Sequence, residues 1–465
     1  MKRIAIVGGG IAGLTAAYEL SRLANNGAAV EAVLFEASPR LGGIVETVRE
    51  GGFVIECGPD AWVTEKPWAR ELAEELGLGD QIMPSNDGTR KTYVVMDGQL
   101  KAMPDGMRMM VPSDLYALDQ SDLFSAQAKQ AFHVEVNRAE ELKINAPQHD
   151  ESVAAFVQRH FGDEVLATIG APLLRGVFGG DVTKLSVRAV MAPFVAMERE
   201  HGSLIAAMQA RAAVSGNKQA AVFTTLQTGL GTLVDSMIAA IPKDWIRLGT
   251  KIRSLSRTNR HWQLQTSTSQ EAFDAVMIAA PAHIARELLL PIDNRAAKLM
   301  EMDASSAVVV SFGFSDATTF RTPPGFGFLV PEGSGSRLLA CTFIDQKFDH
   351  RVPQNGRLIR AFFGGDAAER LMRCGNDEVA SVARLELAHI LGPLPEPQIT
   401  VVRRWPKSLP QYAVGHLERV QQLDERVRSL DGLYLLGNGY RGVGLPDLIR
   451  DARAAAQQSI QGDKR

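Results

Sequence analysis

The first 36 residues show the alternation of apolar runs and glycines that is typical of a βαβ unit. Arg3–Val7 is a short apolar run that ends at the three glycines Gly8–Gly10, and apolar residues then recur at helical spacing across Ile11–Leu23. A second apolar run, Val30–Phe35, ends at Glu36. This pattern predicts a strand, a tight turn, a helix and a parallel strand, joined by the right-handed crossover that such strands nearly always take.

Beyond the βαβ unit the pattern changes twice. Pro67–Leu76 has helical periodicity, and Asp114 to about Gln158 holds amphipathic stretches with few strand signals. Apolar runs typical of strands return at Trp262–Thr266, Ala275–Ala280, Ala307–Phe314, Phe326–Pro331, Leu338–Phe343, Leu358–Phe363 and Leu433–Asn438, and a closing helix is expected over Asp447–Gln457. The predicted fold class is α/β, in which a Rossmann-like domain is combined with an α+β domain and an inserted helical part.

Composition is that of a globular chain with more than one domain. The chain has 465 residues, of which 45% are hydrophobic and 22% charged, so neither a single small core nor a disordered chain is expected. The net charge of −3, without a basic run, argues against a nucleic-acid partner. Cys57, Cys341 and Cys374 lie far apart, which indicates reduced thiols in the cytosol rather than disulfides or a zinc site. No segment has the roughly 20 apolar residues of a membrane span, and the N-terminus leaves no room for a signal peptide.

The glycine turn carries the first chemical signal. Gly8, Gly10 and Gly13 form a G-x-G-x-x-G pattern between a strand and a helix, where glycine permits a tight turn, close approach to a pyrophosphate and close packing of the helix. Glu36 follows 23 residues after Gly13, near the position of a carboxylate that binds ribose hydroxyls and disfavours the 2′-phosphate of NADP. Glycine turns also occur in ordinary loops, but this context favours dinucleotide binding.

The pattern alone does not separate NAD from FAD, and the next segments favour FAD. Glu36–Gly43 resembles the E-x-x-x-R-x-G-G signature of the FAD-dependent amine oxidase superfamily, and Gly51–Pro59 resembles its next block, which lies near the isoalloxazine. No second fingerprint for a nicotinamide is present. The resemblance implies FAD contacts at Gly8, Gly9, Gly10, Ile11, Ala12, Gly13, Glu36, Ala37, Arg40, Gly42, Gly43, Gly58, Pro59, Asp60 and Ile252.

Three later segments resemble the protoporphyrinogen and coproporphyrinogen oxidase family. Leu174–Ser186 is similar to a loop that borders the substrate cavity in that family, Arg404–His416 is similar to a W-x-x-A-L-P-Q-Y-x-x-G-H block, and Gly437–Asp447 is similar to the terminal flavin block. The resemblance spans the chain from Gly8 to the last helix. It implies further flavin contacts at Trp405, Gly437, Val443, Gly444 and Leu445. The terminal block contains no cysteine, so non-covalent FAD is expected.

The same resemblance implies three domains and a substrate pocket. An FAD-binding domain is expected from residues 1–81, 216–289 and 416–465, a substrate-binding domain from 82–104 and 290–415, and a helical, membrane-associating domain from 105–215. The substrate contacts that it implies are Thr92, Arg175, Gly176, Val177, Leu329, Thr342 and Phe362. For Leu329 and Phe362, core packing of a strand is an equal alternative.

One position departs from the family pattern. Thr92 stands where mitochondrial-type enzymes carry an arginine for a substrate propionate, with Arg90 and Lys91 beside it. Either neighbour could supply the charge, although a basic pair before a strand is more often a solvated edge. Whether the substrate carries two propionates or four therefore stays open.

The implied activity is the six-electron oxidation of a porphyrinogen to a porphyrin in haem biosynthesis, with FAD and molecular oxygen. The substrate is protoporphyrinogen IX or coproporphyrinogen III. No catalytic acid or base and no metal site is expected, because the cofactor carries the chemistry and the histidines, His283 and His416 included, show no suitable spacing. The alternatives are another flavin amine oxidase or polyene desaturase of the superfamily, and a non-catalytic carrier of haem precursors.

Expectations about partners and location are coarser. The resemblance implies a homodimer, contact with the next enzyme of the haem pathway, and a cytoplasmic protein at the periphery of the membrane. Met107–Val111 and Asp122–Val134 could form an apolar face at the membrane surface, with Leu123, Phe124, Ala128, Ala131 and Phe132 at helical spacing. An ordinary buried helix face is the alternative for these residues.

Overall fold

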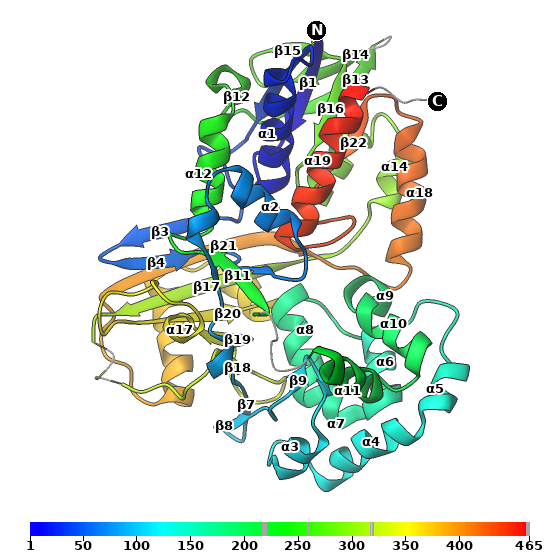
Figure 1. The fold of residues 1–465 in the computed structure, drawn as a ribbon. Coiled ribbons are helices and arrows are strands. Elements are labelled where there is room, and N and C mark those ends of the chain that lie inside the picture. The colour runs from blue at the N-terminus through cyan, green and yellow to red at the C-terminus, as the bar shows by residue number, and fades with distance from the viewer. Residues whose placement is uncertain (216–220, 259–260, 317, 319, 462–465) are drawn as a thin grey trace.

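The computed structural model describes residues 1–215, 221–258, 261–316, 318 and 320–461 (Figure 1). Parts of the predicted domains lie outside the described residues, namely 216–220, 259–260, 317, 319 and 462–465. Among the helices described, none has the length and apolar character needed to cross a membrane.

A parallel five-stranded sheet contains the predicted βαβ unit. Its strand order is β12-β2-β1-β16-β22, and β1, α1 and β2 follow the sequence prediction closely. In Figure 1 this sheet forms the upper body of the molecule. The strands are β1 (Lys2–Val7), β2 (Val30–Phe35), β12 (Ile246–Arg247), β16 (Ala275–Ile278) and β22 (Leu433–Leu435).

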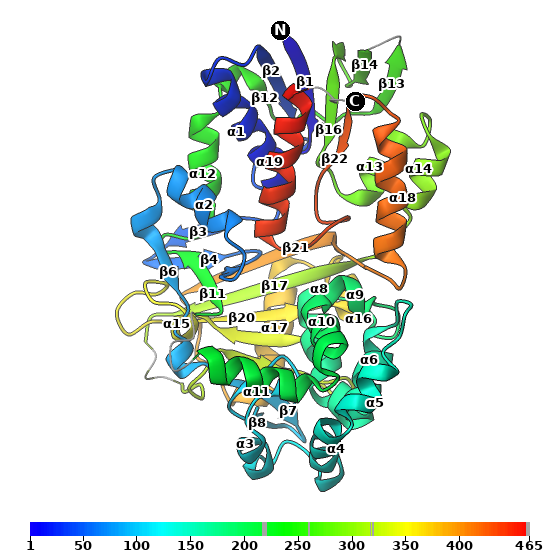
Figure 2. The same ribbon diagram turned by 45° about the vertical axis from the view of Figure 1, so that its right-hand side comes forward.

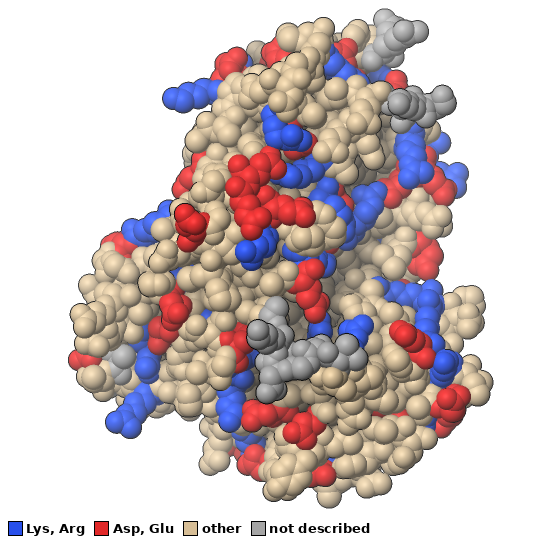
Figure 3. Space-filling model, in the orientation of Figure 1, with Lys and Arg blue, Asp and Glu red and all other residues tan. Residues whose placement is uncertain are grey.

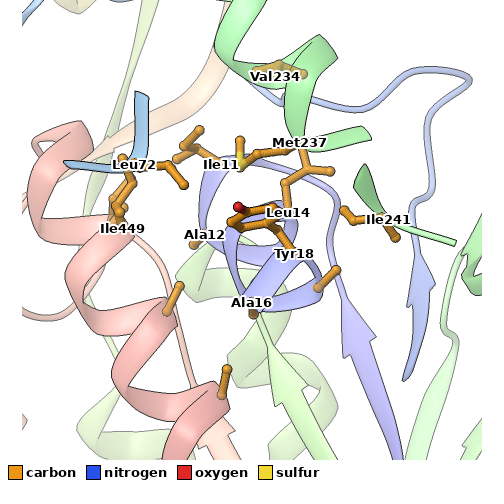
Figure 4. Packing of buried hydrophobic residues seen from close by; sticks show 14 of the residues in the cluster. Ile11, Ala12, Leu14, Ala16, Tyr18, Leu72, Val234, Met237, Ile241 and Ile449 are labelled. Atoms are coloured by element: carbon orange, nitrogen blue, oxygen red, sulfur yellow. The ribbon is translucent and has the colours of Figure 1, made fainter. Parts of the chain in front are cut away.

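Helices cover both faces of this sheet. Figure 4 shows α1 in the centre of one core cluster, where Leu14 and Tyr18 lie among side chains from neighbouring helices such as Met237 and Ile449. A second cluster, which includes Trp262, fills the other face. The elements that surround the sheet are α1 (Ile11–Asn25), α2 (Trp68–Glu75), α12 (Gly231–Ala240), α13 (Ala282–Leu289), α14 (Asn294–Leu299), α18 (His416–Arg428), α19 (Leu445–Gln461), β13 (Ser254–Thr258), β14 (His261–Gln265) and β15 (Gln270–Phe273).

A second, largely antiparallel sheet has seven strands in the order β21-β17-β20-β19-β18-β7-β8. Only β18 and β7 pair in parallel among the described strands of this sheet. One face packs on α17, which lies behind the strands in Figure 2, and the other face shares a buried cluster with Phe53 and Ile55 of β4 (Phe53–Glu56). The elements are β7 (Thr92–Met96), β8 (Gln99–Ala102), β17 (Ala304–Phe314), β18 (Gly327–Leu329), β19 (Ala340–Phe343), β20 (Arg357–Phe363), β21 (Ile399–Pro410), α15 (Ile344–Lys347), α16 (Gly365–Leu371) and α17 (Asn376–Leu391).

Short strands join the two sheets. The strands β3, β4 and β11 lie near the junction of the upper body and the seven-stranded sheet in Figure 1, and β11 forms a three-stranded sheet in the order β5-β11-β6. These strands and one further pair are β3 (Thr47–Glu50), β4 (Phe53–Glu56), β5 (Trp62–Val63), β6 (Ile82–Pro84), β11 (Phe223–Leu226), β9 (Met107–Arg108) and β10 (Val111–Pro112).

Helices between residues 115 and 215 form a cluster with its own core. Its centre is the buried group around Phe132, Phe156 and Phe161. The helices are α3 (Leu115–Gln120), α4 (Ala126–Asn137), α5 (Ala139–Ile144), α6 (Val153–Phe161), α7 (Asp163–Val165), α8 (Ala171–Phe178), α9 (Val187–Val190), α10 (Ala192–His201) and α11 (Leu204–Ser215).

Of the two interpretations of the apolar stripe, a membrane-facing surface and a buried helix face, the structure shows the buried face. Leu123, Phe124, Ala128 and Phe132 are buried in the helical core, and α4 begins only at Ala126. Met110 and Val111 are also buried there. Packing against neighbouring helices buries this stripe. Periodicity shows that a helix has an apolar face, but not what covers that face.

Candidate functional site

The glycine turn after β1 is as tight as the sequence predicts. Gly8 has a φ of +108° and donates its N–H to the Phe35 carbonyl over 2.8 Å. A Cβ added to Gly13 would lie 1.9 Å from the Gly8 carbonyl oxygen, and no side chain could occupy that space. The first turn of α1 therefore packs directly on the end of β1.

Glu36 is fixed beside this turn by backbone donors. Its Oε2 accepts the Gly9 N–H over 2.6 Å, and its Oε1 accepts the Ser38 N–H over 2.7 Å. The backbone carbonyl of Glu36 accepts the N–H of Thr250 over 2.8 Å, which places the 250–252 segment and the buried Ile252 nearby. Each carboxylate oxygen retains lone pairs for a ligand hydroxyl.

A second glycine pair lies against the first. Gly10 and Gly42 form an isolated parallel bridge, and the Gly42 N–H donates to the Gly9 carbonyl over 2.8 Å. A Cβ added to Gly43, whose φ is +59°, would approach the Gly10 Cα to 3.1 Å. Arg40 donates to the Gly43 carbonyl and pairs with Glu46 over 3.2 Å. Ala37 is exposed at the edge of this segment.

The N-terminus of α1 is open for an anion. Gly10 occupies the N-cap position without a side-chain cap, and no acidic residue lies in the first turn that contains Ile11 and Ala12. The unpaired N–H groups and the positive end of the helix dipole are thus uncompensated within the described residues. This end and the glycine cradle fit the pyrophosphate of a dinucleotide such as FAD.

The terminal block joins the same end of the upper body. Leu445 begins α19 and belongs to the core cluster that also contains Ile11, Ala12 and Leu41. Figure 1 shows the N-terminal ends of α1 and α19 side by side. Gly437 and Gly442 have φ values of +118° and +149°, so each needs glycine, while Val443 and Gly444 complete the turn into the helix.

Three side chains from other segments hold Cys57–Asp60 by hydrogen bonds to its backbone. Trp405 Nε1 donates to the Cys57 carbonyl over 2.8 Å and Arg360 Nη2 donates to the Gly58 carbonyl over 2.5 Å. The carbonyl of Asp60 accepts the hydroxyl of Thr225 over 2.8 Å. Gly58 is itself required, because an added Cβ would lie 2.0 Å from the Ile44 carbonyl oxygen.

Charge also fixes this segment, through the carboxylate of Asp60. Lys347 Nζ lies 2.9 Å from Asp60 Oδ2, and the Arg360 guanidinium lies 3.5 Å from the same atom. Burial raises the pKa of Asp60, but the Lys347 ammonium and the Arg360 guanidinium together hold that pKa below its usual value. Asp60 is therefore a carboxylate at neutral pH, and Pro59 sits between two anchored residues.

Trp405 and its neighbours in β21 connect the seven-stranded sheet to the upper body. The guanidinium of Arg40 lies 5.9 Å from the Trp405 ring, and Arg403 pairs with Glu46 over 2.6 Å. The hydrogen bond from Arg403 lowers the pKa of Glu46. The predicted cofactor residues of the N-terminal, central and C-terminal segments are thus brought together around one end of the five-stranded sheet.

The predicted substrate residues of the seven-stranded sheet share one face. Register aligns Thr92 with Gly327 and Leu329 with Ala340, while Gly327 aligns with Thr342 and Ala340 with Phe362. Since aligned residues point to the same side, Thr92, Leu329, Thr342 and Phe362 all project from the face opposite α17.

Burial separates the two faces of this sheet. Leu329, Thr342 and Phe362 are partly exposed, whereas their neighbours Phe328, Cys341 and Phe363 are buried on the α17 side. Core packing was the alternative for Leu329 and Phe362. In the structure it is their neighbours Phe328 and Phe363 that pack in the core. Arg90, which was considered as a source of charge, is exposed and pairs with Asp87 over 3.4 Å.

The structure corrects the prediction of a substrate loop at Arg175–Asp181, because its first residues are helical. Arg175, Gly176 and Val177 lie in the last turns of α8, and the chain leaves the helix only at Gly179, which is left-handed with a φ of +65°. Leu173 and Leu174 and the packing of α8 override the low helix propensity of Gly176.

These residues nevertheless lie next to the strand that carries Leu329. Helix α8 packs beside β18, and Arg175 forms an ion pair with Glu332 just beyond that strand. Gly176 is exposed and Val177 is 51% exposed, so neither belongs to the helical core. The structure thus brings Val177 and Leu329 to neighbouring elements.

Sequence reasoning missed Arg360 and Lys347. Arg360 lies inside the apolar run Leu358–Phe363, and one charged residue within a buried strand was a signal that the sequence contained. Lys347 ends a short helix and had no comparable signal. His416 has the structural role that was expected: it is buried and donates to the Tyr440 carbonyl, and burial lowers its pKa to about 4.

The surface adds little to this site. In Figure 3 acidic and basic side chains are interspersed over the face shown, so no charge of one sign dominates it. Among the described residues, no group of three or more His, Cys, Asp or Glu side chains could hold a metal ion.

Comparisons with known proteins cover almost the whole chain. A family model described as flavin-containing amine oxidoreductase matches residues 11–460. The coproporphyrinogen III oxidase of Bacillus subtilis is 32% identical, with 99% of this chain and 98% of that protein aligned. The chloroplastic/mitochondrial protoporphyrinogen oxidase 2 of Arabidopsis thaliana is 26% identical over 99% of this chain and 94% of its own.

Solved structures agree with these matches. A crystal structure from Exiguobacterium sp. 255-15, named as a candidate protoporphyrinogen oxidase, is 30% identical and superposes with a TM-score of 0.86 over 99% of each chain. The cyclohexylamine oxidase of Brevibacterium oxydans is 16% identical and has a TM-score of 0.72 over 100% of each chain. The second likeness is one of fold.

Proposed function

Because this chain belongs to the flavin-containing amine oxidoreductase family, we propose that it oxidises a porphyrinogen to a porphyrin in haem biosynthesis, with non-covalently bound FAD and molecular oxygen. The observation that carries the proposal is the end-to-end similarity to coproporphyrinogen III oxidases. The substrate is coproporphyrinogen III or protoporphyrinogen IX, since a protoporphyrinogen oxidase is also among the relatives.

The residues of the upper body are proposed to hold FAD. The open N-terminus of α1 and the backbone of Gly9–Gly13 and Gly42–Gly43 bind the pyrophosphate, and Glu36 binds a ribose. Cys57–Asp60, Trp405 and Val443–Leu445 surround the flavin ring. Non-covalent binding is supported by the absence of cysteine from 437–447 and by Cys57, whose thiol pKa burial raises to about 11.

The partly exposed face of the seven-stranded sheet is proposed to hold the macrocycle. When bound, FAD supplies a two-electron acceptor that oxygen reoxidises to give peroxide, so removal of six electrons takes three rounds and three molecules of oxygen. The chain need only orient the porphyrinogen. Leu329 and Phe362 offer apolar contact, Thr92 and Thr342 offer hydroxyls, and Arg175–Val177 at the end of α8 close one side.

A division into three domains goes with this assignment. We propose the FAD-binding domain as 1–81, 216–289 and 416–465, the substrate-binding domain as 82–104 and 290–415, and the helical domain as 105–215. The strands of the two large sheets fall in the first two sets, which supports the division. Contact of the helical domain with a membrane surface, a homodimer and contact with the next enzyme of the pathway stay predictions.

A direct assay tests the proposed function. FAD-loaded protein is incubated in air with coproporphyrinogen III and, separately, with protoporphyrinogen IX, and porphyrin fluorescence is followed. Fluorescence that depends on the protein is expected with at least one of them, and the ratio of rates identifies the substrate. A flavin-loaded protein that produces no porphyrin from either compound would contradict the proposal.

A further inference from the structure

Arg360 occupies an unusual place for an arginine. It lies in the middle of β20, is 1% exposed, and has the apolar neighbours Ile359 and Ala361. Register aligns it with Thr342, which aligns with Gly327, so Arg360 lies on the face proposed to hold the substrate. A buried guanidinium is costly unless its contacts compensate it.

The contacts of Arg360 reach both proposed binding regions. Toward the flavin side, Nη2 donates to the Gly58 carbonyl over 2.5 Å and Nη1 lies 3.5 Å from Asp60 Oδ2. Toward the substrate side, the guanidinium lies 5.0 Å from the centre of the Phe362 ring. One side chain therefore links the segment proposed to lie at the flavin ring to a wall of the proposed substrate pocket.

This buried group also carries excess positive charge. Two cations, Lys347 and Arg360, face the single carboxylate of Asp60. The nearby Arg351 is also a cation, but it pairs with Glu56 at 3.6 Å, so it does not change this excess. Arg360 Nε is buried and has no hydrogen-bond partner among the described residues. In a medium of low dielectric constant, such a charge acts strongly on a neighbouring group that gains or loses electrons.

We propose that Arg360 is a positioning residue, which aligns the Gly58–Asp60 segment with Phe362 and supplies the positive charge that favours reduction of the flavin. The inference rests on the proposed function, because it takes the place of the flavin from it. Reduction adds negative charge to the ring, and a fixed cation close by stabilises the reduced form. Lys347 contributes charge through Asp60, but it has no contact with Phe362 among the described interactions.

The test compares two arginines of the same strand. Arg360→Gln removes the charge, Arg360→Lys keeps it without the planar fork, and Arg357→Gln is the matched control. Arg357 also lies in β20 and pairs with an aspartate, Asp345, over 3.5 Å, but it projects from the opposite face toward Phe320. Each FAD-loaded variant is measured for the midpoint potential of its flavin, and for KM and kcat with the porphyrinogen that the wild type oxidises.

The midpoint potential of the flavin tests the proposed effect of the Arg360 charge, and KM tests its proposed role in alignment. Arg360→Gln is expected to shift the potential to more negative values, by about a tenfold change in the ratio of reduced to oxidised flavin. Arg360→Lys should keep the potential close to that of the wild type but raise KM. Arg357→Gln should change neither quantity, whatever it does to stability.

Two results would overturn the inference: an unchanged potential in flavin-loaded Arg360→Gln, or an equal shift in Arg357→Gln. If Arg360→Gln does not fold, Lys347→Met must shift the potential in the same direction, and its failure to do so counts against the inference. The potential needs no substrate. A wild type that binds flavin but oxidises no porphyrinogen therefore refutes the proposed function, while the shift in Arg360→Gln still decides the charge effect.

Discussion

The two proposed binding regions are built in different ways. The glycine cradle of the upper body is made of backbone from Gly8–Gly13 and Gly42–Gly43, segments that lie close in sequence. The face of the seven-stranded sheet is made of side chains from four strands, from Thr92 to Phe362. The first region depends on what a residue lacks, a Cβ, and the second depends on which way a residue points.

The strongest test of this difference is a side chain placed in the cradle. Gly13→Val sets a Cβ where the Gly8 carbonyl lies at 1.9 Å, so α1 must move away from β1. We expect FAD affinity to fall by at least ~100-fold, with a lower Tm, because overpacking against backbone cannot relax easily. Flavin absorbance after reconstitution measures the loss.

Its control is a glycine outside the cradle. Gly88 has no neighbour within 4 Å of an added Cβ, and Gly88→Ala should leave flavin content unchanged. Full flavin content in Gly13→Val would show that the cradle is not the cofactor site.

Adjacent phenylalanines test the two faces of the sheet. Phe363 is fully buried on the α17 side, and Phe363→Ala should lower the free energy of unfolding by about 3–5 kcal/mol. Phe362→Ala should cost less stability but raise KM about tenfold, as expected for the loss of roughly 1.4 kcal/mol of substrate contact. Denaturant melts and steady-state kinetics separate the effects. Equal losses of stability, with unchanged KM, would place Phe362 in the core.

A smaller effect is expected where a side chain supports the cradle. Glu36→Gln keeps the size of the side chain but removes its negative charge. The carboxylate of Glu36 accepts the N–H groups of Gly9 and Ser38. Charge-assisted hydrogen bonds contribute about 1.5–3 kcal/mol, so the Kd for FAD should rise by about tenfold or more. Fluorescence quenching of FAD on titration gives the Kd. Retention of wild-type affinity would exclude Glu36 as a ribose ligand.

A pH effect is expected at His160 in the helical part, away from the residues proposed to bind FAD or the substrate. His160 is buried between Glu135 at 3.0 Å and Glu198 at 3.1 Å. Burial lowers the pKa of His160, but the hydrogen bonds and the charges of both glutamates raise it by more. The folded-state pKa therefore lies above the usual value.

Stability from this group is complete below the unfolded-state pKa and is lost as pH rises through the raised folded-state pKa. Tm should therefore fall as pH increases above neutrality, and His160→Gln should flatten that part of the curve while lowering Tm at acid pH. An identical slope in the variant would assign the pH effect to other groups.

The backbone cradle could be predicted from the sequence, whereas the side-chain face of the seven-stranded sheet could be predicted only in part. The βαβ unit, the glycine turn and the place of Glu36 follow from local spacing, and the structure has them where the sequence indicates. The direction of Leu329 and Phe362 needed strand register, which sequence spacing does not contain. Arg360 binds Gly58 across some 300 positions of the chain, a contact that no local pattern indicates.

Two outcomes have physical causes of the same kind. The family resemblance implied a loop at Arg175–Val177, but packing keeps these residues in α8. The apolar stripe with Phe124 and Phe132 left a membrane face and a buried helix face open, and neighbouring helices bury it. Both outcomes depend on contacts with distant residues, which local sequence does not contain.

The most direct test joins the two regions in one anaerobic titration. FAD-loaded protein is mixed with coproporphyrinogen III or protoporphyrinogen IX without oxygen, and flavin absorbance and porphyrin fluorescence are recorded together. The account predicts that the flavin is bleached as porphyrin appears, with about three flavins reduced per porphyrin. A flavin that stays oxidised with both porphyrinogens, but is bleached by an amine, would contradict it.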